Sequence, residues 1–247
     1  MLSQILRTSF KLLLISLFLI SCSSSRNSLK PRSGKTTFVL KDRSGEFLYH
    51  RDVKLTNGEI ATRITVLDPT NTTVPVEKTI SISKIGITQK AKLLRPKVSQ
   101  HTIWYDKEKY FSQLQTNTKN KTLDILMESP EKKWQGSNSV VYPPGRIFCF
   151  FTQIPECVKF YGMITGSPEK AYKIVIIWDN FPYQVEAFAN IGEGAFQSGV
   201  FRFESEFKGS LRYKLELSNQ IIFYEFDVNR EFDKMYWIAQ GLTLVRR

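Results

Sequence analysis

Alternation of apolar and polar residues is the feature that most constrains the fold of this chain. From residue 211 to 217, Leu and Tyr occupy every odd position, while Arg, Lys and Glu occupy every even one. Residues 201 to 207 show the same period with Phe on one face. Successive side chains of a strand point to opposite faces, so this pattern predicts strands with one apolar and one solvated face. After the polar break at Ser218-Asn219, apolar alternation resumes, which predicts a hairpin over 211–228.

Comparable strand candidates recur along most of the chain. They cover residues 36–40, 46–55, 59–67, 78–87, 100–105, 109–116, 121–128, 146–152, 172–178, 184–189 and 235–245. Turn-forming residues stand at 56–58, 143–145 and 179–182. The best helix signal is a capping Ser167 before Pro168, and β-rich sequence follows at once. We therefore predict a mainly β protein: a single antiparallel, strongly curved sheet forming a half-barrel, barrel or sandwich, with little helix.

Aromatic residues are abundant, with 18 Phe, 10 Tyr and 4 Trp. In a β protein of this size they fill the core. The alternative is a curved sheet whose concave face is lined by aromatics that hold an acyl chain. Because alternation does not identify which face is interior, the sequence leaves both interpretations open.

The first twenty residues have the pattern of an export signal. An apolar run from Leu12 to Ile20 follows Arg7 and Lys11, with no acidic residue before it. The run is too short to cross a hydrocarbon core of about 30 Å, which takes roughly 20 helical residues. The order of charge and then apolar residues is that of a signal peptide.

The end of this run, Leu19-Ile20-Ser21-Cys22, resembles the lipobox of bacterial lipoproteins. That resemblance implies diacylglyceryl transfer to the Cys22 thiol, cleavage just before it and acylation of the new amine. Ser23 replaces the Asp that retains many such proteins in the inner membrane, so the resemblance implies the outer membrane, facing the periplasm. The alternatives are an ordinary signal peptide and an uncleaved anchor.

The lipobox divides the chain into three predicted parts. Residues 1–21 are a signal peptide, residues 22–35 are the lipidated Cys and a flexible polar tether, and residues 36–247 are one β-rich periplasmic domain. Gly34-Lys35-Thr36 is similar to the end of a phosphate-binding loop, but Leu29 stands where that pattern needs its first Gly. We therefore assign Gly34 and Lys35 to the tether.

The positive charge of the chain, formally +12, is partly local. Residues 78–105 contain no Asp or Glu, so they predict attraction to anionic lipid head groups, with a solvated face as the alternative. Export removes nucleic acid as a partner. The predicted head-group contacts are Lys84, Lys90, Lys92, Arg95 and Lys97.

The two remaining cysteines, Cys149 and Cys157, predict a disulfide, because a nearby pair outside the cytoplasm is usually oxidised. Two free thiols are the alternative. Metal binding would need further ligands, and neither His50 nor His101 has a spacing relation to the pair. We predict no metal and no cofactor.

The expected function is a non-catalytic binding or interaction module of the cell envelope, possessing a membrane anchor and holding a phospholipid or glycolipid. In its lipobox, size, strand-rich pattern and basic excess, the chain resembles the half-barrel carriers and receptors of the LolA and LolB type, at the level of fold. A purely structural or protein-docking lipoprotein is the alternative, followed by an envelope hydrolase. For the hydrolase, the spaced carboxylates at 106 and 108 and at 204 and 206 are more simply a solvated face.

Replacing Cys22 by Ala tests the lipidation site. We expect Cys22→Ala to abolish incorporation of radiolabelled palmitate, since the thiol that receives the lipid is gone. Labelling in the host cell followed by gel electrophoresis measures this. A Ser23→Ala control should label like the wild type, and a labelled Cys22→Ala protein would exclude this thiol as the attachment point.

Overall fold

The computed structural model describes residues 31–87, 92–183, 194–218 and 220–247, and within them almost all regular structure is strand. The mainly β prediction is confirmed. The strands of the first half are β1 (Gly34–Asp42), β2 (Gly45–Thr56), β3 (Glu59–Asp68), β4 (Asn71–Ile87), β5 (Lys92–Tyr105), β6 (Glu108–Asn117), β7 (Thr122–Glu128) and β8 (Gly136–Val141). The strands of the second half are β9 (Phe148–Phe150), β10 (Ala171–Ile177), β11 (Phe196–Phe207), β12 (Ser210–Glu216), β13 (Ile221–Phe226), β14 (Phe232–Trp237) and β15 (Leu242–Arg246).

These strands belong to one sheet that is not closed. β1 to β8 form an antiparallel meander, and β15 to β9 continue it from the other side of β1, so the order is β8 through β1, then β15 through β9. The two halves join where β1 pairs with β15, with Phe38 opposite Arg246. β9 and β10 are the one parallel pair among the described strands, which makes the sheet mixed.

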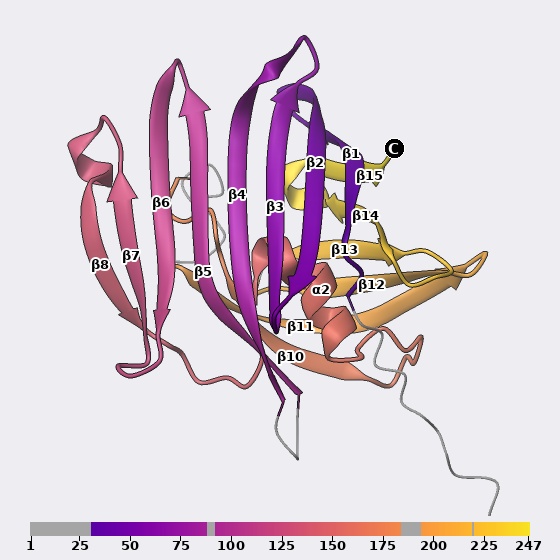
Figure 1. The fold of residues 1–247 in the computed structure, drawn as a ribbon. Helices are drawn as coiled ribbons and strands as arrows, with labels where there is room; N and C mark the ends of the chain where they lie inside the picture. The colour runs from indigo at the N-terminus through magenta and orange to yellow at the C-terminus, as the bar shows by residue number, and fades with distance from the viewer. Residues whose placement is uncertain (1–30, 88–91, 184–193, 219) are drawn as a thin grey trace, which may run out of the picture.

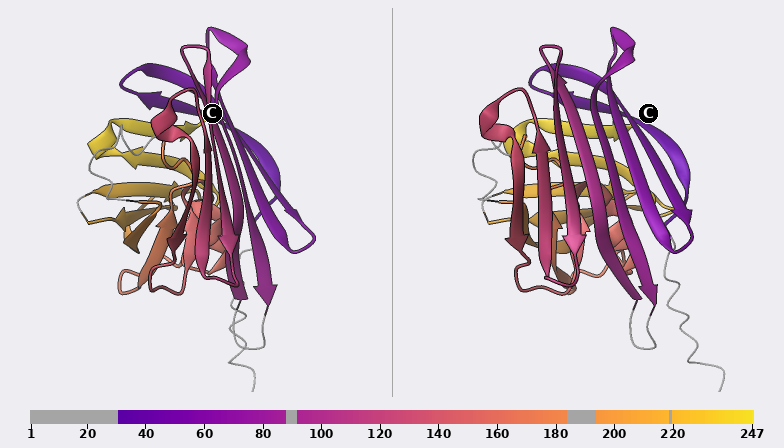
Figure 2. Two further views of the ribbon diagram at one scale, coloured as in Figure 1. Left: turned by 90° about the vertical axis from the view of Figure 1, so that its left-hand side faces the viewer. Right: turned by 60° about the vertical axis from the view of Figure 1, so that its left-hand side comes forward.

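The sheet folds back on itself to bury one face (Figures 1 and 2). β2 to β8 form one layer, the N-terminal layer, and β10 to β13 cross behind it as the C-terminal layer. The short helix α2 (Ile154–Phe160) lies between the layers, and all seven of its residues are buried. Each layer of the sheet has one apolar face. Folding the layers against each other is stabilising because the two apolar faces leave water together.

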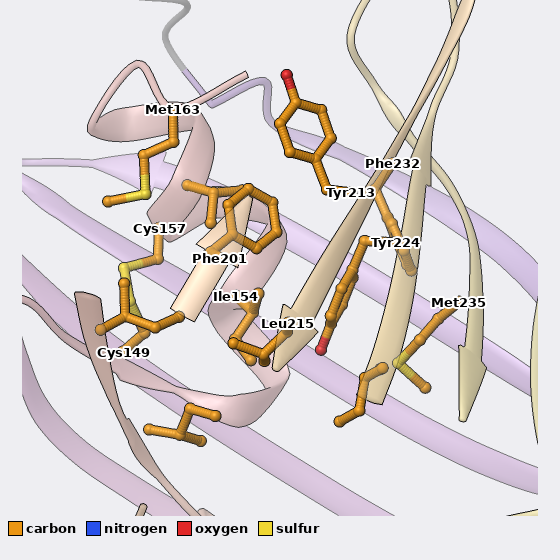
Figure 3. Close-up of a cluster of buried hydrophobic side chains, with 14 of the residues drawn as sticks. Cys149, Ile154, Cys157, Met163, Phe201, Tyr213, Leu215, Tyr224, Phe232 and Met235 are labelled. Atoms are coloured by element: carbon orange, nitrogen blue, oxygen red, sulfur yellow. A yellow bond between two sulfur atoms is a disulfide. The ribbon is translucent and has the colours of Figure 1, made fainter. Parts of the chain in front are cut away.

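Aromatic side chains dominate the space between the layers. Phe201 stacks on Tyr213 at 4.9 Å between ring centroids, and Trp178 stacks on Trp237 at 5.7 Å. Figure 3 shows Phe201 between the cysteines of β9 and α2 on one side and Tyr213 and Tyr224 of the C-terminal layer on the other. A second, smaller cluster is built on Leu114, Leu123, Ile125, Phe150, Ile177 and Ala195. Much of the aromatic content is therefore core.

The segment from β9 to α2 is held by a pair of cysteines, as predicted. The Cys149 and Cys157 sulfur atoms lie 1.91 Å apart, at bonding distance. The 3-10 turn η2 (Phe151–Gln153) leads into α2, whose first turn contains Pro155. Proline suits that position because the first turn of a helix needs no backbone donor there. The predicted strand over 146–152 is therefore only three residues long, and the helix was not predicted.

Several element boundaries differ from the sequence predictions. β1 begins at Gly34, so Gly34 and Lys35, which the sequence analysis assigned to the tether, are strand residues paired with β2. β4 and β5 extend well beyond the predicted 78–87 and 100–105, and β8 was not predicted. The predicted strand 235–245 divides into β14, the 3-10 turn η3 (Ile238–Gln240) and β15, because Gly241 adopts φ +64°. The predicted helix start at Ser167 is only a turn at Pro168 and Glu169, and β10 begins at Ala171. The strand predicted at 184–189 lies outside the described residues.

Truncation of Phe201 tests the core. The side chain is completely buried, so Phe201→Ala should lower the free energy of unfolding by about 3 to 5 kcal/mol. Phe207→Ala in the same strand is the matched control, because Phe207 is 72% exposed and should change stability by less than about 0.5 kcal/mol. Urea unfolding followed by circular dichroism measures both. Equal losses in the two variants would contradict this assignment of the core.

Candidate functional site

Of the predicted head-group residues that the structure describes, Lys84 belongs to β4 and Lys92, Arg95 and Lys97 belong to β5, in the parts of these strands at the bottom of Figure 1. Lys84, Arg95 and Lys97 are all exposed, and the Lys97 ammonium lies 2.9 Å from Glu59. Lys92 is the first residue of β5, and its side chain lies outside the described part, as do Lys90 and Cys22 entirely. Of the five predicted contacts, the structure brings Arg95 to the rim of a groove.

The groove exists because β5 is longer than its neighbour β6 at this end. The last β5–β6 pair at this end is Val98 with Gln115, so residues 92–97 of β5 have no pairing partner in β6. Tyr161, just after α2, satisfies part of this free edge: the Leu94 amide donates to the Tyr161 hydroxyl at 2.9 Å. Thr116 donates its hydroxyl to the Pro96 carbonyl at 2.8 Å. The edge is therefore partly covered by side chains, and a hollow remains beside it.

The groove has a volume of about 710 Å³ and mainly apolar walls. They come from β5, the β6–β7 turn, the β8–β9 connection and the end of α2, segments that Figures 1 and 2 place at one end of the molecule. The apolar lining is made of Leu93, Leu94, Pro96, Val141, Tyr142, Pro143, Pro144, Phe148 and Tyr161.

Three cations, Arg95, Lys121 and Arg146, also line the groove, and no carboxylate is among its described lining residues. All three are exposed at the surface. Tyr142 packs edge-on against Phe148 at 4.9 Å and stiffens the wall between them. The groove thus combines an apolar floor with a cationic rim, which is the chemistry that an anionic amphiphile requires.

The interior of the molecule contains a polar zone between the two apolar clusters. Inward-facing residues of the middle strands of the N-terminal layer are small and hydroxylated, among them Thr62, Thr79, Ser81, Ser83 and Ser99. Their sequence neighbours Ile80 and Ile82 are partly exposed on the outer face. Short inward side chains leave room for polar groups that enter from the opposite side.

Gln153 of η2 is one of these groups, and its amide is fully bonded. Its nitrogen donates to the Ser81 carbonyl at 2.8 Å and to the Ile60 carbonyl at 3.1 Å, and its oxygen accepts from Ser83 at 2.5 Å. Because a buried amide is costly unless it is bonded, these contacts fix η2 against β3 and β4.

Arg51 and Glu156 form a buried ion pair that joins β2 to α2. One guanidinium nitrogen donates to Glu156 Oε1 at 2.7 Å, the other contacts Oε2, and the latter nitrogen also donates to the Thr152 carbonyl at 3.0 Å. Burial alone would lower the pKa of Arg51, but the attraction and hydrogen bonds of Glu156 outweigh it and leave that pKa raised. Arg51 therefore keeps its positive charge in the folded protein.

Asp179, which follows β10, enters the same polar zone. Its Oδ2 accepts from Ser81 at 2.8 Å, from the Thr152 amide at 3.2 Å and from the Thr152 hydroxyl, while Oδ1 has no partner among the described residues. Burial raises the pKa of Asp179 to about 6, although the hydrogen bonds from Thr152 and Ser81 act in the opposite direction.

His101 on β5 is also buried, and burial shifts its pKa in the opposite direction to that of Asp179. Its Nδ1 lies 3.0 Å from the Thr79 hydroxyl and 3.8 Å from Glu77. Burial lowers the pKa of His101 to about 3, so desolvation outweighs the nearby carboxylate and the imidazole is neutral at ordinary pH.

The remaining acidic residues considered in the sequence lie on the surface. Asp106 and Glu108 flank an exposed turn, and Glu204 forms an ion pair with Lys214. Across residues 31–87, 92–183, 194–218 and 220–247, no group of three His, Cys, Asp or Glu side chains could hold a metal ion. Over the same part of the chain, no helix has the length and apolar character needed to cross a membrane.

Sequence reasoning missed Lys121, Arg146 and Asp179. The two cations stand in turns far apart along the chain, and nothing local connects them with Arg95. Asp179 was interpreted only as a turn residue. A usable signal was the alternation of hydroxyl residues at Thr79, Ser81 and Ser83, which marks a polar strand face.

Comparison of the chain with protein-family models, with curated proteins and with solved structures finds no match in any of the three.

Asp179 and His101 should contribute opposite pH dependences to stability. Because its pKa is raised on folding, Asp179 contributes stability at low pH, and this contribution is lost as pH rises through about 6. Because the pKa of His101 is lowered on folding, the stability of the protein falls as pH drops below the ordinary histidine pKa of 6.5. Between pH 6 and pH 4, Asp179→Asn should therefore lose about 2 kcal/mol more unfolding free energy than the wild type. His101→Gln should instead gain relative to the wild type over the same interval.

Urea unfolding at several pH values measures these slopes. Asp106→Asn, in the exposed turn, is the control and should follow the wild-type profile. A profile of Asp179→Asn parallel to that of the wild type would show that Asp179 ionises normally in the folded protein.

Proposed function

We propose that this chain is a lipid-anchored protein of the cell envelope whose groove holds a single anionic amphiphile, a phospholipid or glycolipid, without transforming it. The observation that carries the proposal is the apolar groove of about 710 Å³ with Arg95, Lys121 and Arg146 around it. Its volume lies within the roughly 300 to 1,000 Å³ of ordinary ligand pockets.

The groove has apolar walls and a cationic rim, and this combination supports an amphiphile over a wholly polar ligand. The β5 edge and the wall of Tyr142 and Phe148 offer apolar surface to an acyl chain. The three cations would meet the phosphate or carboxylate of the head group, with Arg able to donate two parallel hydrogen bonds to it.

The position of the described chain start supports a membrane-facing groove. The Leu55 amide donates to the Ser33 hydroxyl at 2.8 Å, which places the start of the domain beside the β2–β3 turn, at the end of the molecule that contains the groove. Nine positions separate Pro31 from Cys22, and an extended chain of that length reaches about 30 Å. Acyl chains on Cys22 would thus keep this end near the bilayer.

Further basic residues at the same end favour contact with anionic lipids. Lys84 and Lys97 are exposed beside Arg95, and Lys119 is exposed in the β6–β7 turn next to Lys121. Each basic residue near an anionic surface contributes about 1 kcal/mol of attraction. Lys97 also pairs with Glu59, so its share would be smaller.

Removal of the three groove cations tests this function. The triple variant Arg95→Gln, Lys121→Gln, Arg146→Gln should bind phosphatidylglycerol at least tenfold more weakly than the wild type, because attraction of about 1 kcal/mol per cation is lost. Native mass spectrometry of the full chain in a nonionic detergent, titrated with phosphatidylglycerol, would measure the one-lipid adduct. Phosphatidylcholine should bind the wild type less well.

The matched control removes the same charge from the opposite end of the sheet, in Lys107→Gln, Lys109→Gln, Lys132→Gln, and should leave the adduct unchanged. An equal loss in both triple variants would indicate a general charge effect. A folded wild type with no lipid adduct would favour the structural or protein-docking alternative, and turnover of the lipid would favour the hydrolase.

A further inference from the structure

A second hollow lies between the layers, away from the groove. It has a volume of about 170 Å³, and its walls come from both halves of the sheet and from η2. Its aromatic lining consists of Tyr49, Phe151, Tyr224 and Phe232. Figure 3 shows Tyr224, Phe232 and Met235, all lining residues, side by side on neighbouring strands of the C-terminal half. A cavity of about 150 Å³ is large enough for benzene, so this one can hold a small organic molecule.

Two buried polar atoms of the cavity lining have no partner among the described residues. Asp179 is 1% exposed, and its Oδ1 is unpaired although Oδ2 accepts three hydrogen bonds. Tyr224 is 2% exposed, and its hydroxyl is also unpaired. Leaving a buried donor or acceptor unpaired costs about 1 to 3 kcal/mol, so both atoms favour a bound partner in the cavity.

The charged residues around the cavity determine which sign of charge a bound molecule should carry. Asp42, Glu77 and Asp179 line it, and the one cation among its described lining residues is Arg51. The charge of Arg51 is already balanced by Glu156, with which it forms two contacts. The lining is therefore net negative, and aromatic rings around a negative site favour a cation further.

We propose that this cavity binds a small primary ammonium ion with a compact apolar body, its N–H groups donating to Asp179 Oδ1 and the Tyr224 hydroxyl. The ionised carboxylate oxygen can only accept, so the ligand must supply the donor. Burial raises the pKa of Asp179 to about 6, and a bound ammonium would lower it again, so the carboxylate is available at neutral pH. This site is independent of the amphiphile groove.

Three ligands of nearly equal shape test the proposal on the full chain in detergent at pH 7.5. Isothermal titration calorimetry should detect binding of cyclohexylammonium, at least tenfold weaker binding of cyclohexanol, and no binding of cyclohexanecarboxylate. Asp179→Asn should weaken cyclohexylammonium at least tenfold, because the amide offers no charge. Tyr224→Phe, which removes one oxygen and keeps the ring, should weaken it severalfold.

Asp124→Asn, at the groove end of the sheet, is the control and should bind cyclohexylammonium like the wild type. Circular dichroism checks folding, and Tyr224→Phe alone decides the result if Asp179→Asn does not fold. No binding of cyclohexylammonium by the wild type would overturn the proposal and leave water as the occupant of the cavity. Equal binding of the ammonium and the alcohol, or unchanged binding in both cavity variants, would overturn it as well.

Discussion

The structure depends on the polar contacts that dock η2 and α2 against the N-terminal layer. Arg51 pairs with Glu156 of α2, and Gln153 of η2 bonds to β3 and β4, so these contacts tie the segment to strands that lie 72 to 105 residues earlier in the chain. Apolar packing alone would let so short a helix slide, whereas buried charges and amides have one satisfactory arrangement. Tyr161, which follows α2, lines the groove, whereas the inner cavity is lined by Phe151 and Thr152 of η2 and by Pro155 of the first turn of α2.

The two hollows divide opposite charges between them. The groove has cations and no described carboxylate, while the cavity has three carboxylates and a cation already paired with Glu156. Both hollows have apolar walls, so hydrophobic contact alone would not distinguish their ligands. Charge distinguishes them, because a ligand with the wrong sign of charge would lose the attraction and would still have to lose its hydration shell. Under the two proposals, one folded sheet would hold an anionic amphiphile near its edge and a small cation in its interior.

Sequence reasoning found the class of fold and most of the strands. Alternation at 211–217 was reliable, since its apolar face lies inside. At 201–207 it held only for the first part of the strand, because the register shifts after Phe203 and Phe207 is exposed. At β4 it predicted a strand but not its interior face, because a period of two does not say which face is interior. There the smaller residues Thr79, Ser81 and Ser83 face inward, and Ile80 and Ile82 are partly exposed. Helix α2 is buried on all sides, so it shows no helical periodicity. Arg95 was predicted from its basic stretch, but Lys121 and Arg146 join it only through the tertiary fold.

The pairing of β1 with β15 has a consequence for how the protein acquires its structure. Strands about two hundred residues apart, with Val39 opposite Val245, must meet before the sheet is continuous. Contacts of such long sequence separation are slow to form, because a large loop must close before they contribute. A chain that crosses a membrane N-terminus first would have formed the meander from β1 to β8 while the apolar inner face still lacked its cover. An apolar sheet face left without its cover favours aggregation, so a chaperone that shields this face would raise the yield of native protein.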